Sequence, residues 1–266
     1  MTKNENVKNC ALITGASRGL GYEFAKLAAD DGQNLVLVSR SEDKLNEIKK
    51  DFERKYDISA NVISADLAKP NSARRVYKET EERSLQIDLL INNAGTGKVG
   101  PFFDSSLEDD ADMMQLNMNS LVKMTKLFGK DMVKRNEGKI MNVSSLAAYQ
   151  PGPLMAIYYA SKAFVLRFSE AVDEELEETG VSVTAYCPSA TDTNFQQSAG
   201  MSDEGPKGLY MADPEEVAEY GYEAMKKEER VTIPGVFNSL MASISRVAPR
   251  KLLTKTVKKI NDNPRG

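Results

Sequence analysis

Short apolar runs alternate along most of this chain with longer segments whose apolar residues recur at helical spacing. The runs lie near residues 10–14, 34–39, 60–65, 88–92, 139–144, 182–187 and 231–233. The intervening segments predict helices near residues 20–31, 42–55, 72–83, 109–134, 154–179 and 214–227. This alternation predicts an α/β fold with about seven strands in one doubly wound parallel sheet and helices on both faces. Ligands of such sheets bind beyond the carboxyl ends of the strands, so we expect the functional site there.

Nothing in the sequence divides the chain into separate units. Its 266 residues could form one large domain or two small ones, but no Pro/Gly/Ser-rich linker, repeat or low-complexity segment separates them. We therefore predict a single domain over residues 1–266. The polar start and the lack of any run of ~18 apolar residues lead us to expect a cytoplasmic protein.

The chain contains no histidine, and this limits its chemistry. Catalytic triads built on histidine are excluded, and we expect no metal site. The two cysteines, Cys10 and Cys187, fall in predicted strands and are expected to be inert core residues. Acid–base chemistry must use Tyr, Lys, Asp or Glu. The acidic composition, with a pI near 5.3, gives no indication of nucleic-acid binding.

A glycine-rich turn, "TGASRGLG", follows the first predicted strand. Gly15, Gly19 and Gly21 would let backbone N–H groups and a helix N-terminus approach a pyrophosphate, with Ser17 and Leu20 in the same turn. The alternative is a turn that serves only strand–helix packing. The position after the first strand of a βαβ unit favours dinucleotide binding.

The end of the second predicted strand carries Ser39 and Arg40, where an NAD enzyme would place an acid for the adenosine ribose. Arg40 and Arg18 could converge on a 2′-phosphate, which suits two guanidinium groups. The alternative is that both are solvated loop arginines. The missing acid favours NADP(H) as cofactor.

Further motifs occur in a characteristic order: Asp66 in "SADLA", "NNAG" at Asn92–Gly95, Asn117 in "QLNMNS", Ser145 in "NVSSLA", "YYASK" and "CPSATDT". With the glycine turn, they resemble the short-chain dehydrogenase/reductase family over roughly residues 10–195. The segments "PEEVAE", "VTIPG" and "APRKLL" are most similar to a bacterial branch of NADP-type oxidoreductases. The resemblance implies a Rossmann-type fold. One departure is Ser189, which stands where the family usually has glycine.

Two adjacent tyrosines, Tyr158 and Tyr159, precede Lys162 by four and three residues, and both spacings bring side chains together on a helix. Helical geometry alone does not choose between them. The family motif Y-x-x-x-K selects Tyr158 and Lys162, with Ser145 as the catalytic serine. Tyr159 then becomes a packing or pocket residue. Without this register, Tyr158 would be a core aromatic residue.

The resemblance implies a role for each site residue. Tyr158 would be the general acid, Ser145 a second donor to the carbonyl oxygen, and Lys162 the ammonium that favours the phenolate and holds the nicotinamide ribose. Asn117 would position a water on a proton path, or else satisfy a backbone carbonyl. The remaining cofactor contacts would come from residues flanking the adenine, its ribose and the nicotinamide: Asp66, Leu67, Asn93, Ala94, Gly95, Pro188, Thr191 and Thr193.

Three segments are expected above the sheet at the substrate: Thr96–Asp104, Leu146–Met155 and Thr193–Met211. Residues 189–212 form a predicted lid. The apolar side chains of these segments suggest a pocket with largely apolar walls, although each could instead pack a loop onto the sheet: Phe102, Phe103, Tyr149, Met155, Phe195, Met201, Leu209 and Met211.

Residues 236–266 form a basic extension. They carry seven Lys/Arg against one Asp, so they total +6 while the other residues of this −4 chain total −10. Apolar residues recur there at helical spacing, which predicts an amphipathic helix. We expect this helix to cover its own domain or a subunit interface, rather than to lie on a membrane, in a homo-oligomer that is a dimer or tetramer.

These features predict an NADPH-dependent short-chain oxidoreductase that reduces a small carbonyl substrate of apolar character to a secondary alcohol, reversibly. The alternative is an NADP-binding sensor or scaffold without significant turnover, which would typically have lost Tyr158, Lys162 or Ser145. All three are present.

Overall fold

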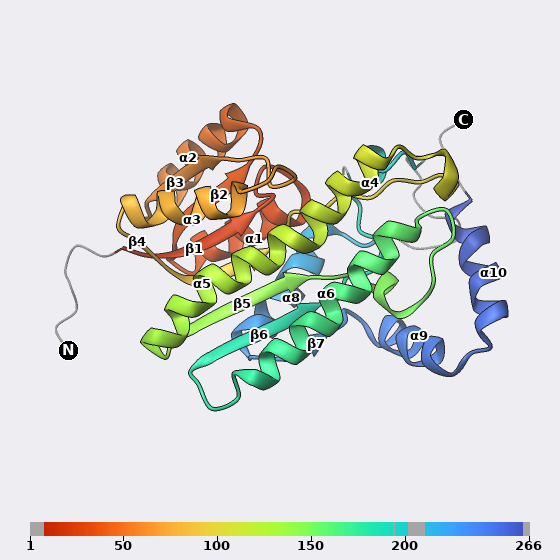
Figure 1. Cartoon of the computed structure of the whole chain (residues 1–266). Helices are drawn as coiled ribbons and strands as arrows, with labels where there is room; N and C mark the ends of the chain where they lie inside the picture. The colour runs from red at the N-terminus through yellow and green to blue at the C-terminus, as the bar shows by residue number, and fades with distance from the viewer. Residues whose placement is uncertain (1–7, 194, 202–210, 263–266) are drawn as a thin grey trace.

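The computed structural model describes residues 8–193, 195–201 and 211–262. Within these residues seven strands form one sheet in the order β3-β2-β1-β4-β5-β6-β7, and every pair of neighbours is parallel. The predicted doubly wound α/β sheet is thereby confirmed (Figure 1). The strands are β1 (Lys8–Thr14), β2 (Asn34–Ser39), β3 (Ala60–Ser64), β4 (Leu85–Asn92), β5 (Gly138–Val143), β6 (Val181–Tyr186) and β7 (Val231–Thr232).

Helices cover both faces of the sheet. One face packs against α1 (Gly19–Asp30), α2 (Glu42–Lys55) and α8 (Pro214–Lys226). The other packs against α3 (Ser72–Glu82), α5 (Leu121–Arg135) and α6 (Ala156–Glu175). Shorter or more peripheral helices are η1 (Phe102–Asp104), α4 (Leu107–Met114), η2 (Gln115–Ser120), η3 (Leu146–Tyr149), α7 (Phe195–Ser198), α9 (Val236–Val247) and α10 (Arg250–Asn261).

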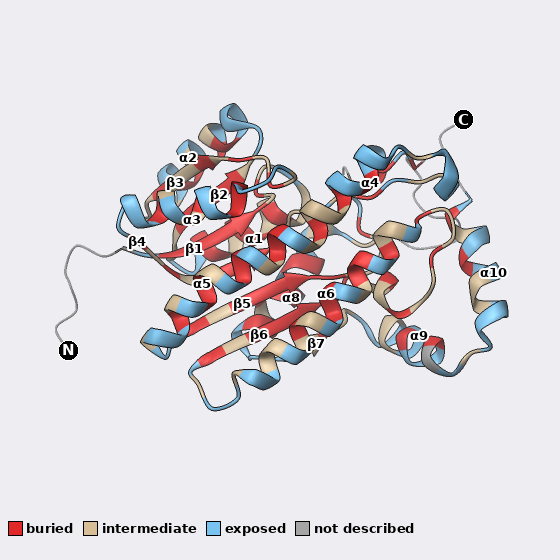
Figure 2. Ribbon diagram, viewed as in Figure 1, coloured by how far each residue is buried: buried red, intermediate tan, exposed pale blue. Residues whose placement is uncertain are grey.

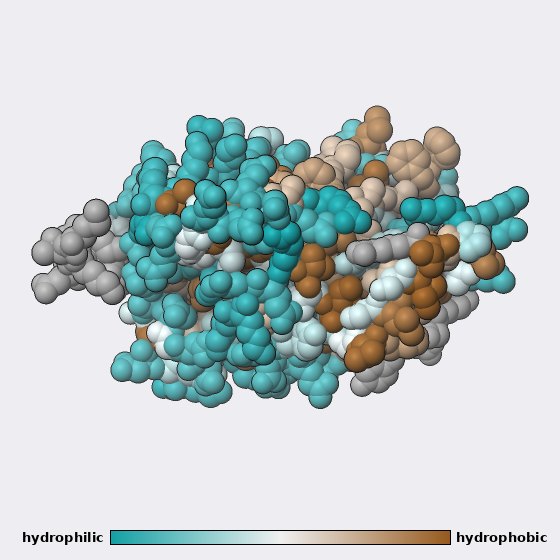
Figure 3. Space-filling view, turned by 90° about the horizontal axis from the view of Figure 1, so that it is seen from below, coloured by the Kyte–Doolittle hydropathy of each residue, from teal (hydrophilic) through white to brown (hydrophobic). Residues whose placement is uncertain are grey.

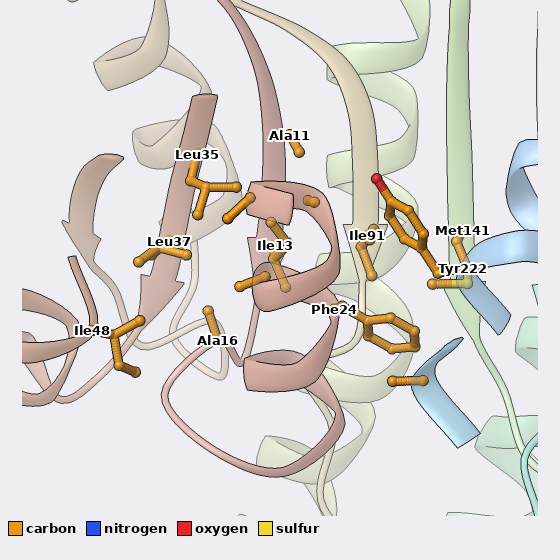
Figure 4. Close-up of a cluster of buried hydrophobic side chains, with 14 of the residues drawn as sticks. Ala11, Ile13, Ala16, Phe24, Leu35, Leu37, Ile48, Ile91, Met141 and Tyr222 are labelled. Carbon is orange, nitrogen blue, oxygen red and sulfur yellow. The ribbon is translucent and has the colours of Figure 1, made fainter. Parts of the chain in front are cut away.

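The strands consist mainly of apolar residues because both faces of the sheet are covered. Side chains alternate between the faces: Ile13 of β1 and Leu37 of β2 pack with Phe24 of α1 (Figure 4), whereas Leu12 packs with Phe128 of α5 on the opposite side. Figure 2 shows the result, with buried strands and helices that are buried only on the side toward the sheet.

Two predicted helices differ from those observed. The segment predicted as one helix over residues 109–134 is divided by the π-helical turn η2, which includes Asn117. The basic extension forms two helices instead of one, because Pro249 follows α9 and has no backbone N–H with which to continue its hydrogen bonding.

The predicted lid lies only partly in the described residues, since 194 and 202–210, including Leu209, fall outside them. Its two ends are held together by a parallel bridge between Thr191 and Ala212. The Asp192 N–H donates to Ala212 O at 2.9 Å, and the Ala212 N–H to Ala190 O at 3.0 Å. Across the part of the chain that the structure covers, no helix has the length and hydropathy required to traverse a bilayer.

Candidate active site

The glycine-rich turn joins β1 to α1 at the carboxyl end of the sheet, and tight packing makes its glycines necessary. Gly15 has φ +70°, a conformation that favours glycine. A Cβ on Gly21 would lie 2.2 Å from Gly15 O, which is too close for any side chain. The turn and the first turn of α1 can pack together only with glycine at this position. Gly21 therefore serves strand–helix packing, while Gly15, Ser17 and Gly19 line the cleft above.

A hydrogen-bond network ties the end of β4 to the end of β1. Thr14 Oγ1 accepts from the N–H groups of Asn93 and Ala94, both at 3.0 Å, and Asn93 Nδ2 donates to Thr14 O at 3.0 Å. This fixes the segment from Asn93 to Gly95 as one wall of the cleft beside the glycine turn.

Arg18 and Arg40 line the same end of the cleft and are exposed. Arg18 is the residue before α1, and Arg40 follows β2 directly after Ser39. Neither arginine forms an ion pair with any described residue, so both guanidinium groups remain available to an anion. Asp66 lines the cleft nearby, with Oδ1 accepting from Ala68 N–H at 3.0 Å.

Asn117 lies in the π-helical turn, buried behind the cleft wall. Its side chain pairs with the backbone of Thr96, accepting from N–H at 3.0 Å and donating to O at 2.8 Å. Nδ2 also donates to Ser161 Oγ at 3.1 Å. Asn117 therefore satisfies a backbone carbonyl, as in the alternative above. The wider turn brings its amide toward α6, and such π-turns occur frequently at functional sites.

Lys162 of α6 is 6% exposed, and its Nζ donates to Val143 O at the end of β5 at 2.8 Å. Burial lowers the pKa of Lys162 from 10.5 to about 8, because an apolar environment disfavours the ammonium. The same Nζ lies 5.8 Å from the centroid of the Tyr158 ring.

Tyr158 and Ser145 approach each other across the cleft from α6 and from the end of β5. Burial raises the pKa of Tyr158 to about 12, and the hydrogen bond with the Ser145 hydroxyl opposes the rise. Burial favours the protonated phenol, and the expected effect of Lys162 on the phenolate stays a prediction. Tyr158 is therefore protonated at neutral pH, the state that a proton donor requires.

The neighbouring Tyr159 has a different environment. Its ring packs on Gly152, and its hydroxyl donates to Asn261 Oδ1 of α10 at 3.0 Å. Asn261 in turn donates through Nδ2 to Pro153 O at 3.0 Å. Tyr159 thus anchors α10 to α6 and also lines the cleft, so it combines the packing and pocket positions expected for it.

One cleft of about 1840 Å³ joins these features. Gly21 and Asn117 lie behind its wall, whereas the other predicted site residues line it: Gly15, Ser17, Arg18, Gly19, Leu20, Ser39, Arg40, Asp66, Leu67, Asn93, Ala94, Gly95, Ser145, Tyr158, Lys162, Pro188, Thr191 and Thr193. The structure brings the predicted set together at one edge of the sheet. Ser189, which departs from the family pattern, also lines the cleft and does not adopt a left-handed backbone conformation.

The apolar part of the cleft differs from the predicted pocket. Met155, Phe195 and Met201 line it, and the Phe195 ring lies 5.2 Å from that of Tyr158. Phe102, Phe103, Tyr149 and Met211 do not line it. The sequence reasoning missed the contribution of the basic extension, which adds Phe237, Met241, Leu253, Val257 and Ile260. Their helical spacing was visible in the sequence, but not the place where the helices dock.

Comparison with known proteins adds independent evidence. Residues 9–204 match the sequence profile of the short chain dehydrogenase family. The human very-long-chain 3-oxoacyl-CoA reductase is 30% identical over 260 residues, covering 96% of this chain and 80% of the relative. The human 17-beta-hydroxysteroid dehydrogenase type 3 is 36% identical over 187 residues, covering 69% of this chain and 60% of the relative.

A solved structure shows the same arrangement. The short-chain dehydrogenase from Sphingobium yanoikuyae in complex with NADPH superposes with a TM-score of 0.81 at 29% identity, covering 91% of this chain and 95% of that one. The profile match spans most of the chain, and the fold agrees with it. This chain therefore belongs to the short-chain dehydrogenase/reductase family of oxidoreductases, which act on CH–OH and C=O groups with a nicotinamide cofactor.

Proposed function

We propose that this chain is an NADPH-dependent reductase that converts an apolar ketone to a secondary alcohol. The observation that carries the proposal is the convergence of Ser145, Tyr158 and Lys162 on one cleft, at the other end of which lie the glycine turn and two unpaired arginines.

The residues present fit an NADP-type cofactor. The Gly15 and Ala16 N–H groups donate to Val38 O, so the N–H groups at the start of α1, from Gly19 onward, are those that would contact a pyrophosphate. Arg18 and Arg40 supply positive charge without a neighbouring acid at the end of β2, which suits a 2′-phosphate and disfavours the unphosphorylated ribose contact of NAD enzymes. The remaining cofactor-binding assignments, from Asp66 to Thr193, stay proposals of the same kind.

The bound nicotinamide would supply a hydride to the carbonyl carbon. Negative charge then develops on the carbonyl oxygen, where the hydroxyl groups of Tyr158 and Ser145 can both donate hydrogen bonds. Tyr158, protonated at neutral pH, would transfer its proton to that oxygen. Lys162 would hold the ribose and supply positive charge beside Tyr158, and Asn117 would keep the Thr96 backbone and α6 in place.

The substrate is proposed to be a long or bulky apolar ketone, such as a 3-oxoacyl thioester or a ketosteroid. The cleft continues from Tyr158 along Met155, Phe195 and Met201 to the apolar residues of α10. The names of the two relatives point to substrates of the same chemical character, a very-long-chain 3-oxoacyl-CoA and a 17-hydroxysteroid.

The test is an NADPH-oxidation screen over 3-oxoacyl thioesters of increasing chain length, ketosteroids, sugar ketones and simple aryl ketones. We expect turnover of the first two classes and little with sugar ketones, because the cleft offers apolar contacts beyond Tyr158. The Tyr158→Phe variant serves as the control for background oxidation. Tight NADPH binding without turnover of any ketone would instead support the alternative, a sensor or scaffold.

A further inference from the structure

Helix α9 turns its large apolar side chains toward solvent. The exposed fractions are 88% for Val236, 70% for Phe237, 55% for Leu240, 44% for Ile244 and 83% for Val247. In Figure 3, apolar surface gathers over the region of α9. A helix that covered its own domain would bury these residues, so covering the domain does not explain this face.

The side of α9 that packs on the domain is formed by its small residues. Ala242 is 3% exposed and Ser245 is 4% exposed. Ala242 contacts the cluster that contains Tyr149 and Cys187. Burial of this side, which carries the small residues, fixes α9 with its large apolar side chains toward solvent. The exposed apolar face is therefore a stable property of the fold.

Three serine hydroxyl groups of α9 form hydrogen bonds along the helix itself. The hydroxyl groups of Ser239, Ser243 and Ser245 donate to the carbonyl four residues earlier, at 3.2, 3.0 and 2.8 Å. They need no partner from water, which lowers the cost of moving this helix into an apolar environment.

Positive charge is concentrated beside this face. The segment from Val236 to Asn261 has no Asp or Glu, and α10 carries five exposed cations: Arg250, Lys251, Lys255, Lys258 and Lys259. Helix α10 follows α9 directly, and both lie at the same end of the molecule (Figure 1). Exposed apolar residues next to cations are typical of helices that lie at an anionic lipid surface.

The cleft also reaches this surface. Phe237 and Met241 of α9 and Leu253 and Ile260 of α10 line it. The exposed face of α9 therefore adjoins the apolar part of the cleft. An apolar ketone dissolved in a bilayer could reach Tyr158 from this side without crossing water.

We propose that α9 and α10 form a docking surface for an anionic membrane. The apolar residues of α9 enter the headgroup region, and the cations of α10 contact lipid phosphates and carboxylates. This differs from the expectation that the extension covers the domain or an interface. Helix α10 covers the cleft through Val257 and Asn261. Helix α9 also lines the cleft, through Phe237 and Met241, but leaves most of its large apolar side chains exposed. The cations of α10 beside this face favour an anionic lipid surface over a second copy of this chain, whose own α10 is equally cationic.

Vesicle flotation of the full chain tests the proposal. We expect binding to phosphatidylcholine vesicles with about 30 mol% phosphatidylserine at about 0.05 M salt, weaker binding at about 0.5 M, and little binding to phosphatidylcholine alone. Lys255→Glu with Lys258→Glu, and separately Leu240→Gln with Val247→Gln, should each weaken binding at least about tenfold. None of these four residues lines the cleft.

The matched control is Lys50→Glu with Lys78→Glu, which makes the same charge change on exposed positions of α2 and α3. It should leave binding within about twofold of wild type. Absence of binding at low salt, or equal loss in the control pair, would overturn the proposal. The proposal would also be overturned if the wild type did not bind vesicles but ran as a dimer on size exclusion, and if Leu240→Gln with Val247→Gln dissociated that dimer. The assay needs no substrate, so its outcome is independent of the proposed reaction.

Discussion

Replacing Lys162 with Met should make the folded protein more stable while abolishing its activity. Lys162 is buried, and the fall of its pKa from 10.5 to about 8 corresponds to about 3 kcal/mol of destabilisation by the buried ammonium at neutral pH. Met has a similar length and carries no charge. The lost hydrogen bond to Val143 O offsets part of the gain, at about 1–2 kcal/mol. A net stabilisation of about 1–2 kcal/mol is therefore expected at pH 7.

The pH dependence gives a sharper version of this prediction. Between pH 8 and 10.5 the unfolded wild-type chain retains a proton on Lys162 that the folded chain has lost. The stability of the wild type therefore rises with pH in this window relative to the variant, and the advantage of Met shrinks. Urea unfolding of wild type and Lys162→Met without cofactor, at pH 7 and near pH 10, measures the difference between their free energies of unfolding. The contributions of all other titrating groups cancel in this difference.

Two outcomes would refute this reasoning. One is a Lys162→Met variant that is less stable than wild type at pH 7. The other is a stability difference that stays constant between pH 7 and pH 10. The expected combination of higher stability and lost turnover would mark Lys162 as a residue that is retained for function.

Three further predictions concern the cofactor end and α10. Replacing both Arg18 and Arg40 with Ala should reduce the preference for NADPH over NADH by about 100-fold in titrations that follow the fluorescence of the reduced cofactor. Equal affinities in the wild type would contradict the phosphate assignment. Gly21→Ala should weaken binding of both cofactors and lower stability by about 1–3 kcal/mol, since its Cβ would overlap a backbone carbonyl; an unchanged unfolding curve would refute this. Asn261→Ala removes the hydrogen bonds with Tyr159 and Pro153, so it should lower stability by about 1–2 kcal/mol and raise KM for the apolar ketone while NADPH affinity is kept. An unchanged KM would show that α10 is not part of the substrate pocket.

The cleft lining around the glycine turn could be predicted because its determinants are local in sequence. The glycine turn follows β1, and Ser39 ends β2 just before Arg40. The carboxyl ends of parallel strands meet at one edge of the sheet. The sheet itself followed from apolar runs at regular spacing. Such features depend on a few consecutive residues and on chain topology, so no long-range contact had to be known.

The parts that were not predicted depend on contacts between distant segments. Asn117 interrupts its helix because its amide binds the Thr96 backbone, which no helical periodicity could show. Tyr159 is held by Asn261, more than a hundred residues away. The spacing of apolar residues in α9 revealed an amphipathic helix, but periodicity alone does not say which side of a helix faces the protein.

The most direct test of the account is the effect of Tyr158→Phe on ketone reduction, with Tyr159→Phe as the matched control. Both variants lose one hydroxyl from adjacent positions on α6, and both tyrosines line the cleft. The Tyr158 hydroxyl hydrogen-bonds with Ser145, whereas the Tyr159 hydroxyl donates to Asn261. We expect Tyr158→Phe to lower kcat for the best ketone by about 100-fold or more while the Kd for NADPH changes little, and Tyr159→Phe to keep most activity. Near-normal turnover by Tyr158→Phe, or loss of turnover only in Tyr159→Phe, would contradict it.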